Sequence, residues 1–303
     1  MRILCIGEII WDVIGPSEYL GGAPLNVAAH ARKLGHEVYL VSAVGDDERG
    51  QRAMGEVLAH DISTDFVQVV RGKPTGTCDV ELGPDGKPIF RIVRPAAYDF
   101  LKLDAAKLDR IGEIEPDWIY YGTLYHTTKR AMASTLELLR HLPSAKVLYD
   151  VNLREGNWSL ATVEQLAARA SVIKLSDSEA EFLDASLDMD GEPGGVEHFC
   201  RRWCDQYRCK TICVTLGERG CGVFMDEAYS VVPGYKVDVA DTVGAGDAFA
   251  AAFIHGLDHH WDAQRCGAFA NAVAALVASR SGAIPQWEVE EVWPMLPAKS
   301  SFR

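Results

Sequence analysis

Residues 241–249 have the sequence Asp241-Thr242-Val243-Gly244-Ala245-Gly246-Asp247-Ala248-Phe249, and an alanine-rich apolar segment typical of a buried helix follows directly. Gly244 and Gly246 allow the backbone to turn sharply and to approach a ligand closely, because they lack a Cβ atom. The amides of residues 244–247 would then lie at the N-terminus of the helix, where unpaired N–H groups and the helix dipole favour an anion. The segment therefore predicts an anion-binding turn followed at once by a carboxylate.

That carboxylate, Asp247, needs an explanation, because a bound phosphate would repel it. A general base that takes a proton from an attacking hydroxyl, next to a transferring phosphoryl group, would provide one. The alternative is an aspartate that only starts a helix after a glycine turn, as in many proteins that are not enzymes. The segment alone leaves both interpretations open.

Around this segment, short β-rich runs alternate with amphipathic stretches along most of the chain. This order predicts an α/β fold with a mainly parallel sheet and helices on both of its faces. The expected buried strands are 2–6, 37–41, 118–121, 146–150, 172–175 and 211–216. The expected helices are 24–34, 47–60, 129–141, 160–169, 196–207, 246–257, 262–280 and 288–295.

One region departs from this alternation. Residues 74–98 contain no helix pattern, only strand-like pieces around the turn residues 83–88. Two strands joined by such a turn form a hairpin, and a hairpin inserted in an α/β core suggests a lid over a cleft. We therefore expect residues 12–20 and 74–98 to form a small β lid. The α/β core would then comprise residues 1–11, 21–73 and 99–303.

Charge and cysteine content narrow the function classes. The 303 residues carry a formal net charge of −13, which argues against nucleic acid or an anionic membrane as a partner. No segment is long enough for a transmembrane span, and the first apolar run meets Glu8 and Asp12 too early for a signal peptide. Eight cysteines without a secretion signal indicate reduced thiols, hence a cytoplasmic protein.

A second glycine segment lies near the start, Gly21-Gly22-Ala23-Pro24-Leu25-Asn26. The glycine pair precedes an expected helix whose first turn contains Pro24, a residue favoured there. Asn26 offers both donors and an acceptor, which suits vicinal hydroxyls. Asn26 could equally cap the local backbone.

Together, the two segments resemble the two signatures of the ribokinase-like (PfkB) carbohydrate kinases, and the resemblance extends from about Gly7 to Pro285. It implies a ribokinase-like three-layer α/β/α core with a small β lid. The chain contains no G-x-x-x-x-G-K-[ST] sequence, which disfavours a P-loop kinase. Within the family the chain is most similar to fructokinases.

The resemblance assigns catalytic and sugar-binding roles to matching residues. It implies that Asp247 activates the sugar hydroxyl and that the amides of Gly244, Ala245 and Gly246 hold the transferring phosphoryl group. Further residues would bind sugar hydroxyls, namely Asp12, Gly22 and Asn26.

Two further segments would contribute to the substrate site. Residues 150–154 resemble the D-x-N-x-R run of fructokinases and ketodeoxygluconate kinases, which implies that Asn152 and Arg154 contact the substrate. Arg91 and Arg94 lie on the second lid strand, and a regular strand cannot aim both toward the cleft because they are three residues apart. We expect Arg94 to be the one that faces the substrate.

The resemblance also implies a nucleotide site. Residues 174–179 resemble the family's N-x-x-E region, with Ser176 in place of the usual Asn, and Glu179 would organise Mg²⁺ through water. Ser176 and Glu179 also fit a capping box, and both roles could coexist. The resemblance places the nucleotide at Thr215, Gly217, Gly220 and Asn271, and allows K⁺ to bind backbone carbonyls at Asp241, Val243 and Ala283.

These expectations combine into a function. We expect ATP- and Mg²⁺-dependent phosphorylation of a primary hydroxyl of a small sugar, with fructose as the favoured substrate. The first alternative is 2-keto-3-deoxygluconate, whose carboxylate would need arginines in the pocket; ribokinase and nucleoside kinase activities are less favoured. A catalytically dead sugar sensor is the non-enzyme alternative. The resemblance also allows a homodimer through the lid strands, whose exposed edge would permit pairing.

Overall fold

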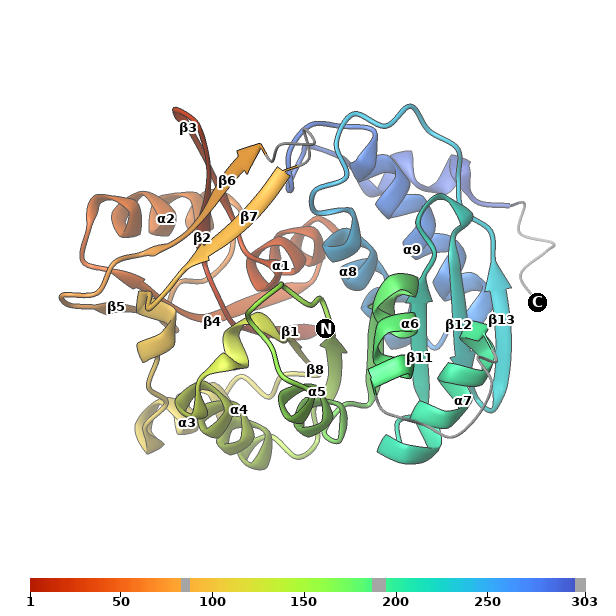
Figure 1. Cartoon of the computed structure of the whole chain (residues 1–303), viewed down its shortest axis with the longest axis horizontal. Coiled ribbons are helices and arrows are strands. Elements are labelled where there is room, and N and C mark those ends of the chain that lie inside the picture. Colours follow the sequence, from red (N-terminus) through yellow and green to blue (C-terminus); the bar gives the residue numbers. More distant parts are fainter. Residues whose placement is uncertain (83–87, 187–194, 298–303) are drawn as a thin grey trace.

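The computed structural model describes residues 1–82, 88–186 and 195–297. Within them, nine strands form one sheet in the order β13-β12-β11-β10-β9-β8-β1-β4-β5 (Figure 1). All neighbouring strands pair in parallel except at β12 and β13, which run antiparallel at one edge. The strands are β1 (Arg2–Ile6), β4 (Glu37–Gly45), β5 (Val67–Val70), β8 (Trp118–Gly122), β9 (Lys146–Asp150), β10 (Val172–Ser176), β11 (Thr211–Thr215), β12 (Cys221–Met225) and β13 (Ala228–Val232).

Helices cover both faces of this sheet, because its strands bury side chains on both sides. In β1, Ile3 and Cys5 pack into one apolar cluster, and Leu4 and Ile6 pack into the other. The first layer contains α1 (Ala23–Lys33), α2 (Glu48–Ala59), α8 (Ala245–Asp258) and α9 (Ala263–Ala278). The second contains α3 (Ala105–Gly112), α4 (Lys129–His141), α5 (Leu160–Ala167), α6 (Asp177–Ser186) and α7 (Gly195–Tyr207). The three-layer α/β/α core is confirmed.

A second sheet projects from one side of the core (Figure 1). Its strands are ordered β3-β2-β6-β7 and comprise β2 (Ile10–Ile14), β3 (Ser17–Gly21), β6 (Gly76–Leu82) and β7 (Pro88–Val93). They overlap the two segments, 12–20 and 74–98, that we assigned to the lid. The turn at 83–87 lies outside the described residues.

The strand order contains one change of direction. From β1 the chain proceeds to β4 and β5 on one side, and later returns to β8 on the other side before continuing outward to β13. Ligands of open α/β sheets bind where the order reverses, beyond the carboxyl ends of the strands. This point falls between β1 and β8, so the residues that follow Ile6 lie where a ligand is expected.

The expected strands are all present, and so are the expected helices with one exception. A helix over 288–295 is wrong, because the structure has only two short 3₁₀ turns there, Val289–Glu291 and Trp293–Met295. Pro294 lacks the N–H that a continuous helix would need at that point. Among the described residues, no helix combines the length and the apolar character needed to cross a membrane.

Candidate functional site

Two cavities meet at the N-terminus of α8 and share Thr242 and Gly246. The first, of about 610 Å³, lies under the second sheet, and we call it the lid-side cavity. The second, of about 500 Å³, lies beside α9, and we call it the α9-side cavity. The lid-side cavity is lined by residues that include Glu8, Ile10, Asp12, Gly22, Asn26, Cys78, Asn152, Arg154, Glu155, Lys174, Gly244 and Asp247.

Gly244 begins α8 and closes the turn between the cavities. Its φ of 78° is in the left-handed region, and a Cβ atom there would stand 2.2 Å from the carbonyl oxygen of Ala283. Only glycine fits this position. The Ala245 N–H donates to the Thr242 carbonyl at 3.3 Å, and the following amides belong to the first turn of α8, where helices leave N–H groups without intrahelical partners.

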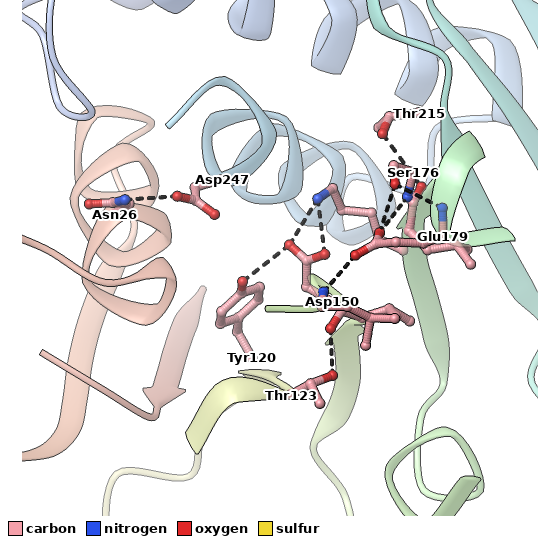
Figure 2. Close-up of polar contacts among 12 residues, drawn as sticks. Asn26, Tyr120, Thr123, Asp150, Ser176, Glu179, Thr215 and Asp247 are labelled. Atoms are coloured by element: carbon pink, nitrogen blue, oxygen red, sulfur yellow. Dashed lines mark hydrogen bonds and ion pairs between the residues drawn. The ribbon is translucent and has the colours of Figure 1, made fainter. Parts of the chain in front are cut away.

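Asp247 lies in this first turn and faces α1. Asn26 Nδ2 donates to Asp247 Oδ2 at 2.8 Å, so the two motifs, 221 residues apart, meet directly (Figure 2). Burial raises the pKa of Asp247 to about 6, and the negative charge of Asp150 adds to the effect, while the Asn26 hydrogen bond and the charges of Lys174 and Arg154 oppose it. A carboxylate with this pKa can accept a proton near neutral pH.

A buried ion pair supports the floor of the lid-side cavity. Lys174 on β10 and Asp150 on β9 are register partners, and Lys174 Nζ donates to both carboxylate oxygens at 2.9 and 3.0 Å. Tyr120 donates to the same carboxylate at 3.2 Å (Figure 2). Burial opposes the charge of Lys174, but the Asp150 carboxylate outweighs it and raises the pKa of Lys174.

Lys174 also approaches the glycine turn, since its Nζ lies 3.5 Å from the point where a Cβ on Gly246 would stand. We did not predict a role for Lys174 from the sequence. A signal was present, because a lysine inside an otherwise apolar strand must be paired. Its partner could not be identified without the register of β9 and β10.

Two acidic residues line the opposite wall of the lid-side cavity. Burial raises the pKa of Asp12, on β2, to about 6, and Arg154 and the Cys78 thiol oppose this shift. Burial also raises the pKa of Glu8 to about 7. Asp12 was predicted, whereas Glu8 was missed. The signal that could have identified Glu8 is its position directly after the first buried strand, where ligands bind.

The loop after β9 brings Asn152 and Arg154 into the lid-side cavity, as predicted from the D-x-N-x-R run. Asn152 has a φ of 39°, a left-handed conformation that asparagine tolerates. Glu179 holds the loop in place, because its Oε1 accepts from the Leu153 N–H at 2.6 Å. The charge of Arg154 acts on Glu8, Asp12 and Asp247 alike.

Ser176 and Glu179 form the capping box that we considered as their alternative role. Glu179 Oε2 accepts from the backbone N–H and hydroxyl of Ser176 at 2.8 and 2.9 Å, and the Glu179 N–H donates back to Ser176 Oγ at 3.3 Å (Figure 2). Neither residue lines either of the two cavities. Their roles toward nucleotide and Mg²⁺ therefore stay predictions.

The expectation for Arg94 needs correction. The strand β7 ends at Val93, and the Arg94 guanidinium pairs with Asp99 and donates to the Leu124 carbonyl at 2.9 Å. Arg91 pairs across the strands with Asp79 at 3.1 Å and is exposed. Neither arginine lines the lid-side cavity, so Arg154 is the arginine that reaches it.

The α9-side cavity contains four of the residues expected at the nucleotide, Thr215, Gly217, Gly220 and Asn271, and consists mainly of glycine, alanine and valine. The Asn271 amide is buried and donates to the carbonyls of Val232 and Pro233 at 3.2 and 3.1 Å, so it fixes the chain after β13. The cavity is lined by residues that include Thr215, Gly217, Glu218, Gly220, Tyr235, Lys236, Val237, Val239, Phe249, Asn271, Ala274, Ala275 and Ala278.

The three residues expected near K⁺ are joined to the glycine turn. The Asp241 carboxylate accepts from the N–H groups of Val243 and Gly282 at 3.0 and 3.1 Å. The Ala283 carbonyl interacts with His30 Nε2 at 3.0 Å. Because the Trp287 indole N–H donates to His30 Nδ1, Nε2 must carry the proton that is donated to Ala283. Of the three backbone carbonyls, that of Ala283 accepts this hydrogen bond, and the binding of K⁺ by the three carbonyls stays a prediction.

This arrangement suits transfer of an anionic group between two ligands. A carboxylate with a raised pKa lies beside helix N-terminal amides, at the junction of one cavity rich in carboxylates and another built from small residues. The amides and the helix dipole would stabilise negative charge that develops at the junction. A hydroxyl in the lid-side cavity could lose its proton to Asp247.

Comparisons with known proteins agree with this chemistry. The family model described as pfkB family carbohydrate kinase matches residues 2–290. A relative from Arabidopsis thaliana, named Probable fructokinase-2, is 30% identical over 280 residues, which cover 88% of this chain and 82% of the relative.

Solved structures show the same fold. Fructokinase from Xylella fastidiosa with bound ATP has a TM-score of 0.85 at 25% identity, with 97% of both chains covered. A 2-dehydro-3-deoxygluconokinase from Thermotoga maritima has a TM-score of 0.84 at 21% identity, covering 97% of this chain and 99% of that one, a likeness of fold alone. Given the family match over nearly the whole chain, together with this fold and this site, the chain belongs to the pfkB family of carbohydrate kinases.

Proposed function

We propose that this kinase transfers the γ-phosphoryl group of ATP to a primary hydroxyl of a neutral sugar, with fructose as the first candidate. The main support for a neutral substrate is the excess of acidic side chains in the lid-side cavity. Among the described residues, four acidic ones line it (Glu8, Asp12, Glu155 and Asp247) against two basic ones, and Lys174 is already paired with Asp150. Sugar hydroxyls can donate to carboxylates, whereas a substrate carboxylate would meet repulsion.

The reaction follows from the positions of the groups. Asp247 takes the hydroxyl proton while the sugar oxygen forms a bond to the γ-phosphorus, and the bond from phosphorus to the bridging oxygen of ADP breaks. The amides at the start of α8 stabilise the charge on the transferring group. The β lid covers the sugar and excludes water that would otherwise accept the phosphoryl group.

Nucleotide and cation are part of the proposal. The α9-side cavity would hold the nucleotide, and the Xylella fastidiosa structure with bound ATP supports this choice. Both oxygens of Glu179 accept hydrogen bonds from the protein, and the described residues contain no cluster of three His, Cys, Asp or Glu side chains suited to a metal. A divalent ion, Mg²⁺ as we propose, would thus be held mainly by the ATP phosphates and water, as is usual for Mg²⁺. Replacing Na⁺ by K⁺ in the assay tests whether K⁺ activates.

The 2-keto-3-deoxygluconate alternative is supported by Arg154, a cation in the lid-side cavity that could pair with a carboxylate. Arg94 and Arg91, the other arginines that this alternative would need, are paired elsewhere. The neutral sugar is therefore the better fit.

The experiment is a measurement of ADP release with ATP, Mg²⁺ and a panel of fructose, glucose, ribose, 2-keto-3-deoxygluconate and nucleosides. We expect the largest kcat/KM for a neutral sugar, fructose foremost. A higher kcat/KM for the sugar acid would overturn the choice of substrate class. Absence of stimulation by every panel member would support the sugar sensor instead.

We also propose a homodimer through the second sheet. The face that carries Asp12 presents exposed apolar side chains, namely Ile14 (48% exposed), Tyr19 (57%) and Phe90 (54%), of which Phe90 also lines the cavity. Contiguous apolar surface of this kind marks interaction sites. Light scattering should give twice the mass of the 303-residue chain, and Tyr19→Glu should shift it to the monomer.

A further inference from the structure

Glu8 is a buried acidic residue of the lid-side cavity for which the phosphoryl transfer provides no role. It follows β1 directly, at the point where the strand order reverses, and its side chain is only 4% exposed. The backbone N–H groups of Glu8 and Ala23 lie close enough to its carboxyl group to lower its pKa, although burial raises it more. The Oε2 atom, however, is shielded from solvent and has no partner among the described residues. A buried carboxyl oxygen without a partner is costly, so it needs a reason.

The neighbours of Glu8 suggest that reason. Asn26 Oδ1 is a second buried acceptor without a partner in the part of the chain that the structure describes, and both residues line the lid-side cavity. Asp12 and Asp247 line it as well. A wall of unsatisfied acceptors is matched by a ligand with several hydroxyl donors.

Glu8 could instead have a structural role at the start of α1. The N-cap residue of α1, Gly22, has no side chain to cap the helix, and the Glu8 carboxyl contacts the Ala23 N–H in its place. A Cβ on Gly22 would stand 2.5 Å from the Glu8 carbonyl oxygen, so the two backbones are packed together. Capping of this kind stabilises a helix. Yet Oε2 has no partner among the described residues, and capping does not account for it.

We infer that Glu8 is a specificity-determining residue, whose carboxyl group accepts a hydrogen bond from a sugar hydroxyl other than the one that is phosphorylated. This inference rests on the proposed phosphorylation of a neutral sugar. Asp247 and Asn26 would hold the reacting hydroxyl, and Glu8 would select sugars that have a second hydroxyl at the right distance. Its anchoring to the start of α1, which also carries Asn26, would fix that distance.

The test combines a variant with altered substrates. Glu8→Gln keeps an acceptor for the Ala23 N–H but removes the charge that Glu8 carries above its raised pKa of about 7, so the assays are run at pH 8. For the wild type and Glu8→Gln we would measure kcat, KM and the Kd of ATP without sugar, using fructose and its monodeoxy analogues that keep the reacting hydroxyl. We expect the KM for fructose to rise about tenfold or more, as for loss of a charged hydrogen bond, with kcat and the Kd of ATP within about twofold.

The decisive result concerns the analogues. For the one that lacks the hydroxyl bound by Glu8, the variant and the wild type should have KM values within about twofold, because the contact is already absent. If the KM ratio is the same for every analogue, or is close to one for fructose itself, Glu8 acts only as a cap and the inference is overturned. If the proposed function itself is wrong, the result is different, because the wild-type enzyme would then phosphorylate no neutral sugar.

Two further variants serve as controls for the loss of a carboxylate and for the effect of Glu8 on stability. Asp79→Asn removes a carboxylate from the second sheet, which also carries Asp12, but on the face opposite to the cavity, where Asp79 pairs with Arg91; it should leave every KM unchanged. Glu8→Asp keeps the charge and shortens the reach, and it should raise the KM for fructose while keeping the melting temperature closer to that of the wild type than Glu8→Gln does.

Discussion

The two cavities that meet at Gly246 are built on different principles. Six charged side chains line the lid-side cavity, which are Glu8, Asp12, Arg154, Glu155, Lys174 and Asp247. In the part of the chain that the structure describes, the charged residues of the α9-side cavity are Glu218 and Lys236, both exposed, among glycine, alanine and valine. With the ligands placed as we propose, the sugar would be recognised by side-chain chemistry and the nucleotide by shape and backbone. Substitutions on the two sides should therefore have different signatures.

The largest effect is expected beneath the lid-side cavity. Lys174→Met would leave the Asp150 carboxylate buried without its counter-charge, which typically costs about 3–5 kcal/mol of unfolding free energy. As a control, Arg201→Met breaks an exposed pair with Glu197 and should cost less than about 1 kcal/mol. Urea unfolding measures both. Equal costs would show that the buried pair does not support the cavity.

At the turn between the two cavities, substitutions should act mainly by moving the backbone. In Gly244→Ala the new Cβ would meet the Ala283 carbonyl, so the turn must shift and kcat should fall at least about 100-fold, as when a charge-stabilising donor is lost. Gly282→Ala is a matched control, because its φ of 88° is equally unsuited to alanine but no atom lies within 4 Å of the new Cβ. It should cost stability but keep kcat within about threefold. Similar kcat values for the two variants would contradict this account of the turn.

Lowering the pH should slow the reaction, because it protonates Asp247. Its base function needs the ionised form, and its pKa is raised to about 6 by burial and by Asp150. At saturating sugar, kcat should therefore fall about tenfold per pH unit below 6. A kcat that stays constant down to pH 5 would contradict the raised pKa.

The raised pKa of Asp247 has the opposite effect on stability, which should be greater at low pH. A carboxyl group whose pKa is raised on folding favours the native state at low pH, and this contribution is lost as the pH rises from 3.8 to about 6. Asp247→Asn should accordingly melt at a higher temperature than the wild type at pH 8, and at a similar temperature near pH 4. Thermal melts at both pH values test the sign.

The smallest effect is expected in the α9-side cavity. Asn271→Ala removes the hydrogen bonds to Val232 and Pro233 and should weaken ATP binding by about fivefold, with the KM for sugar unchanged. Gln264→Ala removes a weaker, exposed bond to Val231 and should leave ATP binding as it is. Calorimetry with ATP measures both. If Asn271→Ala changed the KM for sugar and left ATP binding unchanged, the assignment of nucleotide and sugar to separate cavities would be contradicted.

What could be predicted from the sequence is what local chemistry dictates. The strands were recognisable because both faces of the sheet are apolar, and the glycine turn because the positive φ of Gly244 leaves no other residue. Neither feature depends on knowing which strand lies beside which. The direct contact between Asn26 and Asp247, in contrast, was not predicted, because the packing of α1 against α8 creates it.

What could not be predicted depends on register and strand order. Lys174 and Asp150 meet because β9 and β10 pair in one register, and Glu8 becomes part of the site because the strand order reverses beside β1. For Arg94, counting along a strand failed, since β7 ends one residue earlier and Asp99 pairs with the arginine. Such partners are fixed only by the tertiary structure.

The most direct test of Asp247 as the base is a single-turnover experiment. Excess Asp247→Asn enzyme would be mixed with radiolabelled ATP, Mg²⁺ and fructose, or with the neutral sugar that the panel selects. The geometry predicts that sugar phosphate forms about 10²–10⁴ times more slowly than with the wild type, with an unchanged Kd for ATP. A rate within about tenfold of the wild type would contradict the assignment of Asp247 as the group that takes the hydroxyl proton.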